Sequence, residues 1–126
     1  MYITLRKGFF SIVRYDPEME DLPGEPGAHL LVRARLRGDI ERVFGWDYPV
    51  HETLKNDYAY RAIIPNEVVA RTLVRELAQV NYTNFKSSIP VQDELRLGFY
   101  ATIWGAGMDA QEREQRRIKQ KRGRHG

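Results

Sequence analysis

The sequence predicts an α+β fold, a single domain in which helices pack on one face of a mostly antiparallel sheet. Three observations support this prediction. Residues 29–37 and 58–64 alternate apolar and polar side chains with the period of two that is typical of strands. Residues 66–80 and 91–104 repeat apolar side chains every three or four positions, as helices do. The order of these segments favours a ferredoxin-like or related split-βαβ sandwich.

The start of the chain is predicted to supply strands. Residues 2–5 and 9–15 are rich in Phe, Ile, Val and Tyr, and Lys7-Gly8 between them favours a turn or bulge, so we expect a β-hairpin or one long bent strand. Residues 16–27 combine Pro, Gly and acidic side chains, which predicts a solvated, mobile loop. In residues 29–37 alternate side chains should face the core and the solvent. The core set is Leu30, Val32, Ala34 and Leu36, and the opposite set is Leu31, Arg33, Arg35 and Arg37.

A short helix and one more strand are predicted next. Gly38-Asp39 can begin a helix that Gly45 ends, and residues 46–53 resemble a loop. Residues 58–64 form a strand that Pro65 closes, because proline has no N–H to donate to a sheet and suits the first turn of a helix.

Two helices are predicted in the second half of the chain. Residues 66–80 form the more regular one, and Pro90 opens another, which Gly105 and Gly107 end. Residues 110–121 consist of good helix formers but lack an apolar stripe, so they should be a frayed helix or disordered. The predicted core joins both helices to the sheet and contains Leu30, Val32, Leu73, Leu77, Phe99 and Ile103.

Composition bounds the class of protein. With 126 residues, 42% of them hydrophobic, the chain suffices for one core. Cysteine is absent, which excludes disulfides and thiol catalysis, and no apolar run is long enough for a signal peptide or a membrane span. We therefore expect a cytoplasmic protein with no membrane association.

The positive charge is concentrated at the end of the chain. Residues 109–126 contain seven Arg or Lys and three acidic residues, whereas residues 1–108 contain 13 Arg or Lys and 14 acidic residues. We therefore expect a domain at 1–108 followed by a basic, flexible or frayed-helical tail at 109–126.

The sheet face away from the helices is the first candidate binding surface. Arginine beside tyrosine on an open sheet can bind single-stranded nucleic acid, because bases stack on the rings and guanidinium groups bind phosphates. The alternative is that the tyrosines are half-buried strand residues and the arginines are ordinary solvated side chains. The candidate residues are Arg33 and Arg35, joined on the neighbouring strand either by Tyr58 and Tyr60 or by Arg61, depending on the register of that strand.

Two further segments are candidate contact sites. The segment after residues 66–80 offers Tyr82, Asn84 and Lys86, although Asn84 could instead cap a turn and Phe85 could fill the core. The basic tail is a candidate phosphate-binding arm, or merely a solubilising end. Its cations are Arg113, Arg116, Arg117, Lys119, Lys121, Arg122 and Arg124.

Motifs for catalysis are missing from the sequence. It contains no phosphate-binding G-x-x-x-x-G-K-S/T loop, no G-x-G-x-x-G, no H-E-x-x-H and no G-x-S-x-G, and its three histidines are scattered. Asp57 and Asp93 are the carboxylates near the polar segments that could act as a general base. We predict no catalytic residue, no metal site and no cofactor.

Several short motifs resemble those of a set of short uncharacterised bacterial and phage-borne proteins. They include Lys7-Gly8-Phe9-Phe10-Ser11-Ile12-Val13, Asp57-Tyr58-Ala59-Tyr60-Arg61 and Tyr82-Thr83-Asn84-Phe85-Lys86, and the resemblance covers roughly residues 1–104. It implies a shared fold but no activity. The residues that it marks are Arg33, Tyr58, Tyr60, Arg61, Tyr82, Asn84 and Lys86.

The sequence therefore predicts a small non-enzymatic binding protein that contacts single-stranded nucleic acid or a nucleic-acid-associated protein. The first alternative is a protein-protein interaction adaptor or homo-oligomer, in which the aromatic residues and Trp104 are interface anchors. The second is a small hydrolase or nuclease.

Overall fold

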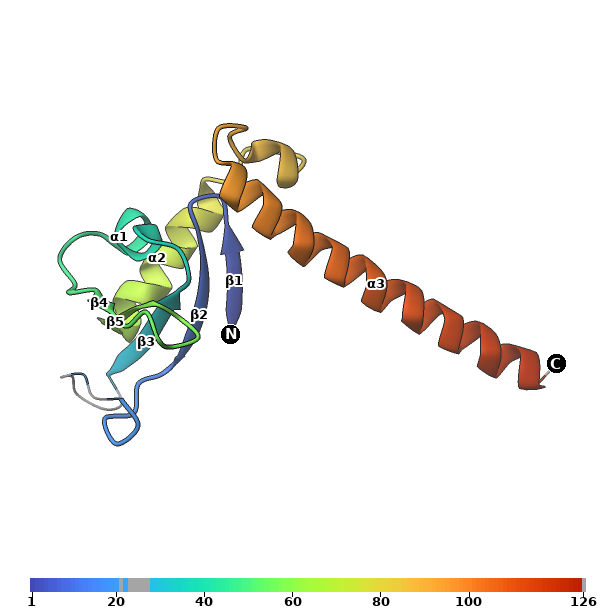
Figure 1. The fold of residues 1–126 in the computed structure, drawn as a ribbon, viewed down its shortest axis with the longest axis horizontal. Helices are drawn as coiled ribbons and strands as arrows, with labels where there is room; N and C mark the ends of the chain where they lie inside the picture. The colour runs from blue at the N-terminus through green and yellow to red at the C-terminus, as the bar shows by residue number, and fades with distance from the viewer. Residues whose placement is uncertain (21, 23–27, 126) are drawn as a thin grey trace. The chain divides into compact units, whose positions relative to one another are not determined.

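The computed structural model of the protein describes residues 1–20, 22 and 28–125. The chain forms two compact units, Met1–Asn81 and Tyr82–Gly126. Strands and helices are both present, and the sheet is antiparallel (Figure 1), so the predicted α+β class is confirmed. No helix among the described residues combines the length and the apolar character that crossing a membrane requires.

The first unit contains one sheet, which has five strands among the described residues. Its order is β1-β2-β3-β5-β4, and every neighbouring pair is antiparallel. The strands are β1 (Tyr2–Leu5), β2 (Gly8–Arg14), β3 (His29–Ala34), β4 (His51–Glu52) and β5 (Tyr60–Pro65).

Part of the predicted topology is present in this sheet. Strands β3 and β4 both lie antiparallel to β5, which separates them, so they run parallel to each other. The helix α1 (Asp39–Phe44) lies between them in the chain, which makes β3-α1-β4 a split βαβ unit. A second such unit, which a ferredoxin-like fold needs, is not found in the described part of the chain.

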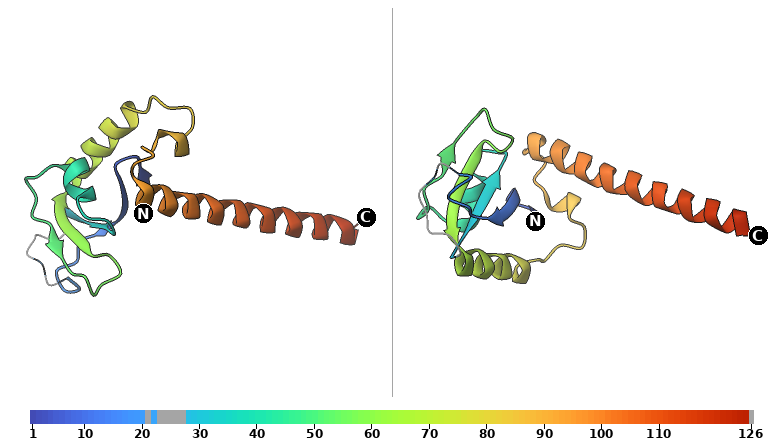
Figure 2. Two further views of the ribbon diagram at one scale, coloured as in Figure 1. Left: turned by 45° about the horizontal axis from the view of Figure 1, so that its top comes forward. Right: turned by 90° about the horizontal axis from the view of Figure 1, so that it is seen from below.

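Two helices cover one face of the sheet. The helix α1 and the helix α2 (Asn66–Ala78) contact each other and pack on this face (Figures 1 and 2). The strands contribute every second residue to the core, as strand geometry requires. The buried core consists of Phe10, Ile12, Val32, Ala34, Ile40, Val43, Phe44, Ala62, Ile64 and Val69.

The short helix α1 is held at its start by its own first residue. The carboxylate of Asp39 is fully buried and accepts hydrogen bonds from the Phe9 backbone N–H at 3.2 Å and from Arg42 Nη2 at 2.5 Å. It therefore ties the β1-β2 hairpin to α1. Gly38 and Gly45 flank the helix with φ angles of 86° and 95°, in the left-handed region that favours glycine, so the predicted ends of this helix are confirmed.

Four details of the first unit differ from the predictions. Residues 46–53 contain β4, whose two residues are too short to show alternation and are defined by pairing with β5. The predicted strand 29–37 ends at Ala34, and Tyr58 lies in the loop before β5. Leu77 was predicted to be buried but is 74% exposed. The part of α2 that packs against the core ends one turn earlier, at Leu73.

The predicted mobile loop lies partly outside the described residues. Residues 21 and 23–27 are not described, so that prediction is not tested there. Before them, the Glu18 backbone N–H donates to Asp16 Oδ1 at 3.0 Å, which forms a turn.

The second unit consists of a short 3₁₀ helix, η1 (Lys86–Ser88), and the 32-residue helix α3 (Glu94–His125). The prediction that Gly105 and Gly107 end this helix is wrong. A glycine inside a helix costs only about 1 kcal/mol relative to alanine, and good helix formers follow both positions. The helix therefore continues through residue 108 and includes the basic residues as far as 124.

The predicted core is also corrected in this unit. Phe99 and Ile103 are half-buried residues of α3 and are not part of the cluster of buried side chains between the sheet and its helices. Leu95, in the same predicted stripe, is 70% exposed.

Candidate functional site

A row of mostly polar side chains crosses the sheet on the face opposite α1 and α2. Paired residues on neighbouring strands point to the same face. Tyr2 pairs with Ser11, Ser11 with Arg33, Arg33 with Arg61, and Arg61 with His51. The structure thus brings the predicted site residues Arg33 and Arg61 together.

Tyr58 adds an aromatic ring to this row from the loop before β5. The guanidinium carbons of Arg33 and Arg35 lie 4.7 and 4.2 Å from the centre of its ring, within the range of a cation–π interaction. Arg33 Nη2 donates to Ser11 Oγ at 2.6 Å, and Arg35 Nη1 donates to the carbonyl oxygen of Asp57 at 2.7 Å. These contacts hold both arginines against Tyr58, and we call Ser11, Arg33, Arg35 and Tyr58 the Arg–Tyr cluster.

The hydroxyl groups of Tyr58 and Tyr2 are hydrogen-bonded to each other. Burial raises the pKa of Tyr58, but hydrogen bonds to Tyr2 and Ser11 and the positive charge of Arg35 together lower this pKa below 10.0. The hydrogen bond to Tyr58 raises the pKa of Tyr2 above 10.0.

This face of the sheet is closed at its centre, which corrects the expectation of an open surface. Tyr58 is only 5% exposed, and Tyr15 and Leu31 on the same face are also buried. The Tyr15 hydroxyl donates to the carbonyl oxygen of Leu22 at 2.5 Å. Arg61 Nη1 contacts both carboxylate oxygens of Glu20, at 2.7 and 2.8 Å. The loops around Tyr58 and Glu20 thus form a second, smaller core, in which the cluster has a structural role.

The remaining candidate of the sheet, Tyr60, lies on the other face. It pairs with Ala34, whose side chain is in the core, and it packs against that core. Its ring is 5.6 Å from the guanidinium carbon of Arg37. Of the two alternatives, Arg61 is thus the strand residue that joins Arg33, because Tyr60 and Arg61 are neighbours in β5 and point to opposite faces. Tyr58 lies on the side of Arg33 because it belongs to the loop before β5.

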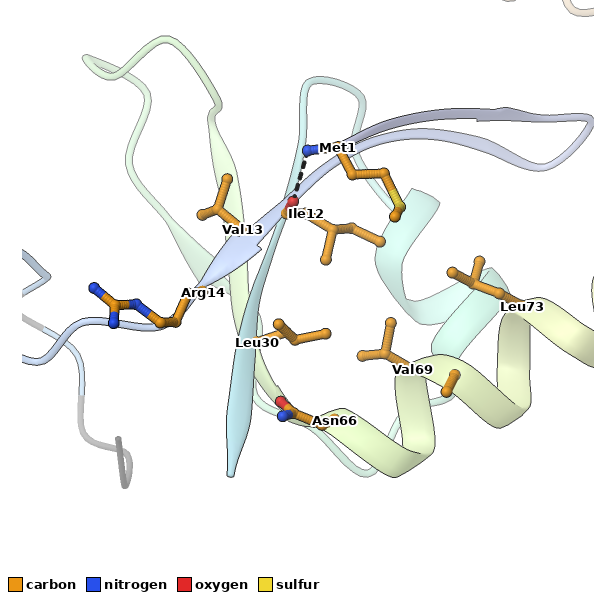
Figure 3. A pocket seen from close by; sticks show the side chains of 9 residues that line it. Met1, Ile12, Val13, Arg14, Leu30, Asn66, Val69 and Leu73 are labelled. Atoms are coloured by element: carbon orange, nitrogen blue, oxygen red, sulfur yellow. Dashed lines mark hydrogen bonds between the residues drawn. The ribbon is translucent and has the colours of Figure 1, made fainter. Parts of the chain in front are cut away.

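An apolar cavity of about 340 Å³ lies between the sheet and α2 (Figure 3). The side chains of Met1, Ile12, Leu30, Val69 and Leu73 converge on it, whereas the side chain of Arg14 points away. Apart from Arg14, the lining residues carry no charged side chain. The cavity can therefore accommodate an apolar group.

The second unit holds the predicted segment from Tyr82 to Lys86 against α3. The ring of Phe85 lies 5.7 Å from that of Tyr82 and is stacked at 5.6 Å on that of Tyr100. Asn84 Oδ1 accepts a hydrogen bond from the Ser87 backbone N–H at 3.2 Å, so it closes the turn that leads into η1, as the structural alternative proposed. Thr83, Asn84 and Lys86 are the exposed residues of this segment. The Nζ atom of Lys86 lies 3.8 Å from the ring centre of Trp104, which is 53% exposed.

The base of α3 contains a charged residue that the sequence analysis missed. The side chain of Arg96 is buried, donating from Nε to Asp93 Oδ2 at 3.0 Å and from Nη1 to the Tyr100 hydroxyl at 3.0 Å. Asp93, considered above as a general base, is thus engaged in an ion pair. Within the described residues there is no group of three or more His, Asp or Glu side chains placed to hold a metal ion.

The second half of α3 presents cations on one side. At 3.6 residues per turn, five of its seven cations fall within about 140° of one another around the helix axis. We call these five the basic stripe: Arg113, Arg116, Arg117, Lys121 and Arg124. All five are exposed, and the ion pair described for them joins Arg113 to Asp109 at 2.9 Å. Lys119 and Arg122 point to other sides of the helix.

Comparisons with known proteins give no assignment. A scan against protein-family models finds no match, and neither the curated proteins nor the solved structures that were searched contain one.

Proposed function

We propose that this protein binds nucleic acid through its phosphate backbone, with the basic stripe of α3 as the contact surface. The observation that carries the proposal is the placement of five exposed cations on one side of a continuous helix. Lysine and arginine side chains that neutralise phosphates release condensed counterions, and this release supplies most of the affinity of sequence-independent binding.

The length and chemistry of the stripe support this ligand. From Arg113 to Arg124 the stripe spans about 16 Å, at 1.5 Å per residue, so it can meet several phosphates in a row. Ile118 is the large apolar residue of this segment, and a helix that lies on a membrane needs a whole apolar face. A helix segment with so little apolar surface gains more from a polyanion than from an apolar partner.

The burial of the predicted aromatic residues favours binding to the phosphate backbone of the nucleic acid over stacking on its bases. Single-stranded binding proteins stack bases on exposed rings. The ring of Tyr58 is buried and Tyr60 packs against the core, so the sheet provides no free ring at the predicted positions. Trp104, beside Lys86, is an exposed ring on α3. We therefore expect binding with little dependence on sequence.

A salt titration of matched variants tests the proposal. Binding to a fluorescent 20-base-pair duplex, and to one of its strands, is measured by anisotropy between 50 and 200 mM salt. The double variant Arg117→Gln/Lys121→Gln removes two cations of the stripe, and Lys119→Gln/Arg122→Gln removes two cations elsewhere on the same turns. The first should lower the slope of log affinity against log salt by about two units on the duplex, and the second by clearly less. An intact protein that does not bind at 50 mM salt would refute the proposal.

A second candidate function is protein–protein association through the end of α2. Val74 and Leu77 on α2 and Val80 just after its end are exposed large apolar residues three positions apart, and such patches mark interaction sites. Sedimentation of the intact protein and of Leu77→Glu, without nucleic acid, tests this candidate. Concentration-dependent association that the substitution abolishes would favour it.

A further inference from the structure

The second half of α3 is accessible from every side. The helix is continuous through this half (Figure 1), and residues 106–124 are all exposed. At 1.5 Å per residue, this is about 28 Å of helix with solvent on all of its faces. The second unit makes its contacts to α3 nearer the start of the helix, where Phe85 stacks on Tyr100. A helix that is exposed over this length can enter a groove of another molecule as well as touch its surface.

The basic stripe has an inner row and two edges. At 3.6 residues per turn, three of its arginines point within about 40° of one another around the helix axis. This inner row consists of Arg113, Arg117 and Arg124. Arg116 lies about 60° to one side of the row and Lys121 about 40° to the other. Gln120 lies inside the same arc, and Glu114, the acidic residue of this segment, lies just outside it.

The diameter of the helix decides which groove it can enter. An α-helix with its side chains is about 10–12 Å across. The major groove of B-form DNA is about 12 Å wide and 8.5 Å deep, whereas its minor groove is about 6 Å wide. In duplex RNA the major groove is too narrow for side chains to read, and the minor groove is shallow. Of the grooves of the two duplexes, the major groove of B-form DNA is therefore the one that admits this helix.

We propose that the second half of α3 lies in the major groove of B-form DNA, with the basic stripe facing the groove floor. This inference rests on the proposed function and names its ligand. Arg116 and Lys121, at opposite edges of the stripe, then reach phosphates of the two strands that border the groove, while the inner row faces the base edges. Every base pair presents an acceptor there, the N7 atom of its purine. Flexible arginines can therefore find a partner at each position without requiring a particular sequence.

Disulfide trapping locates the helix on the duplex, because the chain contains no cysteine. Gln120→Cys places a thiol inside the basic stripe, and Gln115→Cys places one about 140° away on the same helix; both glutamines are exposed. Two 20-base-pair DNA duplexes of one sequence carry the same short disulfide tether, one on cytosine N4 in the major groove and the other on guanine N2 in the minor groove. At 50 mM salt, Gln120→Cys should link to the major-groove tether at least tenfold faster than to the minor-groove tether, and Gln115→Cys should show a clearly smaller ratio. Equal rates of Gln120→Cys at the two tethers would overturn the groove assignment.

A comparison of three duplexes of one sequence separates this inference from the proposed function. Anisotropy with the intact protein at 50 mM salt compares DNA, RNA, and DNA whose cytosines are replaced by glucosylated 5-hydroxymethylcytosine, which fills the major groove but leaves the backbone charge unchanged. The RNA and the glucosylated DNA should each bind at least tenfold more weakly than the plain DNA. Equal affinity of either one would overturn the groove assignment and leave the proposed function standing. If none of the three duplexes binds, the proposed function fails and this inference fails with it.

Discussion

Replacing Tyr58 tests whether its ring belongs to a structural core or to a binding surface. The ring is 5% exposed and contacts the guanidinium groups of Arg33 and Arg35 at 4.7 and 4.2 Å. Truncating a buried aromatic residue to alanine costs about 3–5 kcal/mol, and the lost cation–π contacts belong to that range. We therefore expect Tyr58→Ala to lower the free energy of unfolding by about 3–5 kcal/mol. Tyr58→Phe keeps the ring and loses only hydroxyl hydrogen bonds, so it should cost about 1 kcal/mol.

Urea unfolding, followed by the near-ultraviolet circular dichroism of the aromatic residues, measures both costs. Nucleic-acid affinity is measured in parallel, and Tyr58→Phe should leave it unchanged. A Tyr58→Ala protein that loses less than 1 kcal/mol of stability but binds nucleic acid tenfold more weakly would show that the ring is a stacking surface. That result would refute the second core described here.

Four other substitutions have defined outcomes. On α2, Val69→Ala should lower the free energy of unfolding in urea by about 2 kcal/mol because Val69 is buried. Leu77→Ala should change it by less than about 0.5 kcal/mol because Leu77 is exposed. Equal costs for the two substitutions would contradict the exposure of Leu77. Tyr2→Phe removes a hydrogen bond that lowers the pKa of Tyr58, so the pKa of Tyr58 should rise. An absorbance titration at 295 nm measures this change, and an unchanged pKa would show that the two hydroxyl groups do not interact. Gly107→Ala should stabilise α3 by about 0.5–1 kcal/mol, seen as greater ellipticity at 222 nm on heating, because a Cβ there meets no other atom; a loss of helix would mean that the helix ends at this glycine.

Most strands and helices could be predicted because their signals are local. Alternation in β3, the period of α2 and the glycines around α1 depend on neighbouring residues only. The strand β4 could not be predicted, since its two residues are extended only because β5 pairs with them. The length of α3 was underestimated because Gly105 and Gly107 were interpreted as an end. Glycine ends a helix reliably only where the backbone adopts a positive φ, and neither residue does so.

The candidate site was only partly predictable from the sequence. Alternation places Arg33 and Arg35 opposite the core, but the position of Arg61 depends on its register with β3, which no local pattern specifies. The burial of Tyr58 depends on a loop folding back over the sheet. The spacing of the cations in residues 113–124 was visible in the sequence, but it became a surface only once that segment was seen to be helical.

The strand order also has consequences for folding kinetics. Strands β1, β2 and β3 pair with their sequence neighbours. The ladder between β3 and β5, by contrast, begins at Ala34 opposite Tyr60 and must close over residues 35–59. Closing that loop costs chain entropy before its contacts are gained, so we expect β5 to join late, after the three-stranded meander. The bridge from Arg61 to Glu20 can form only at that late step, which places the second core among the last parts of the unit to become ordered.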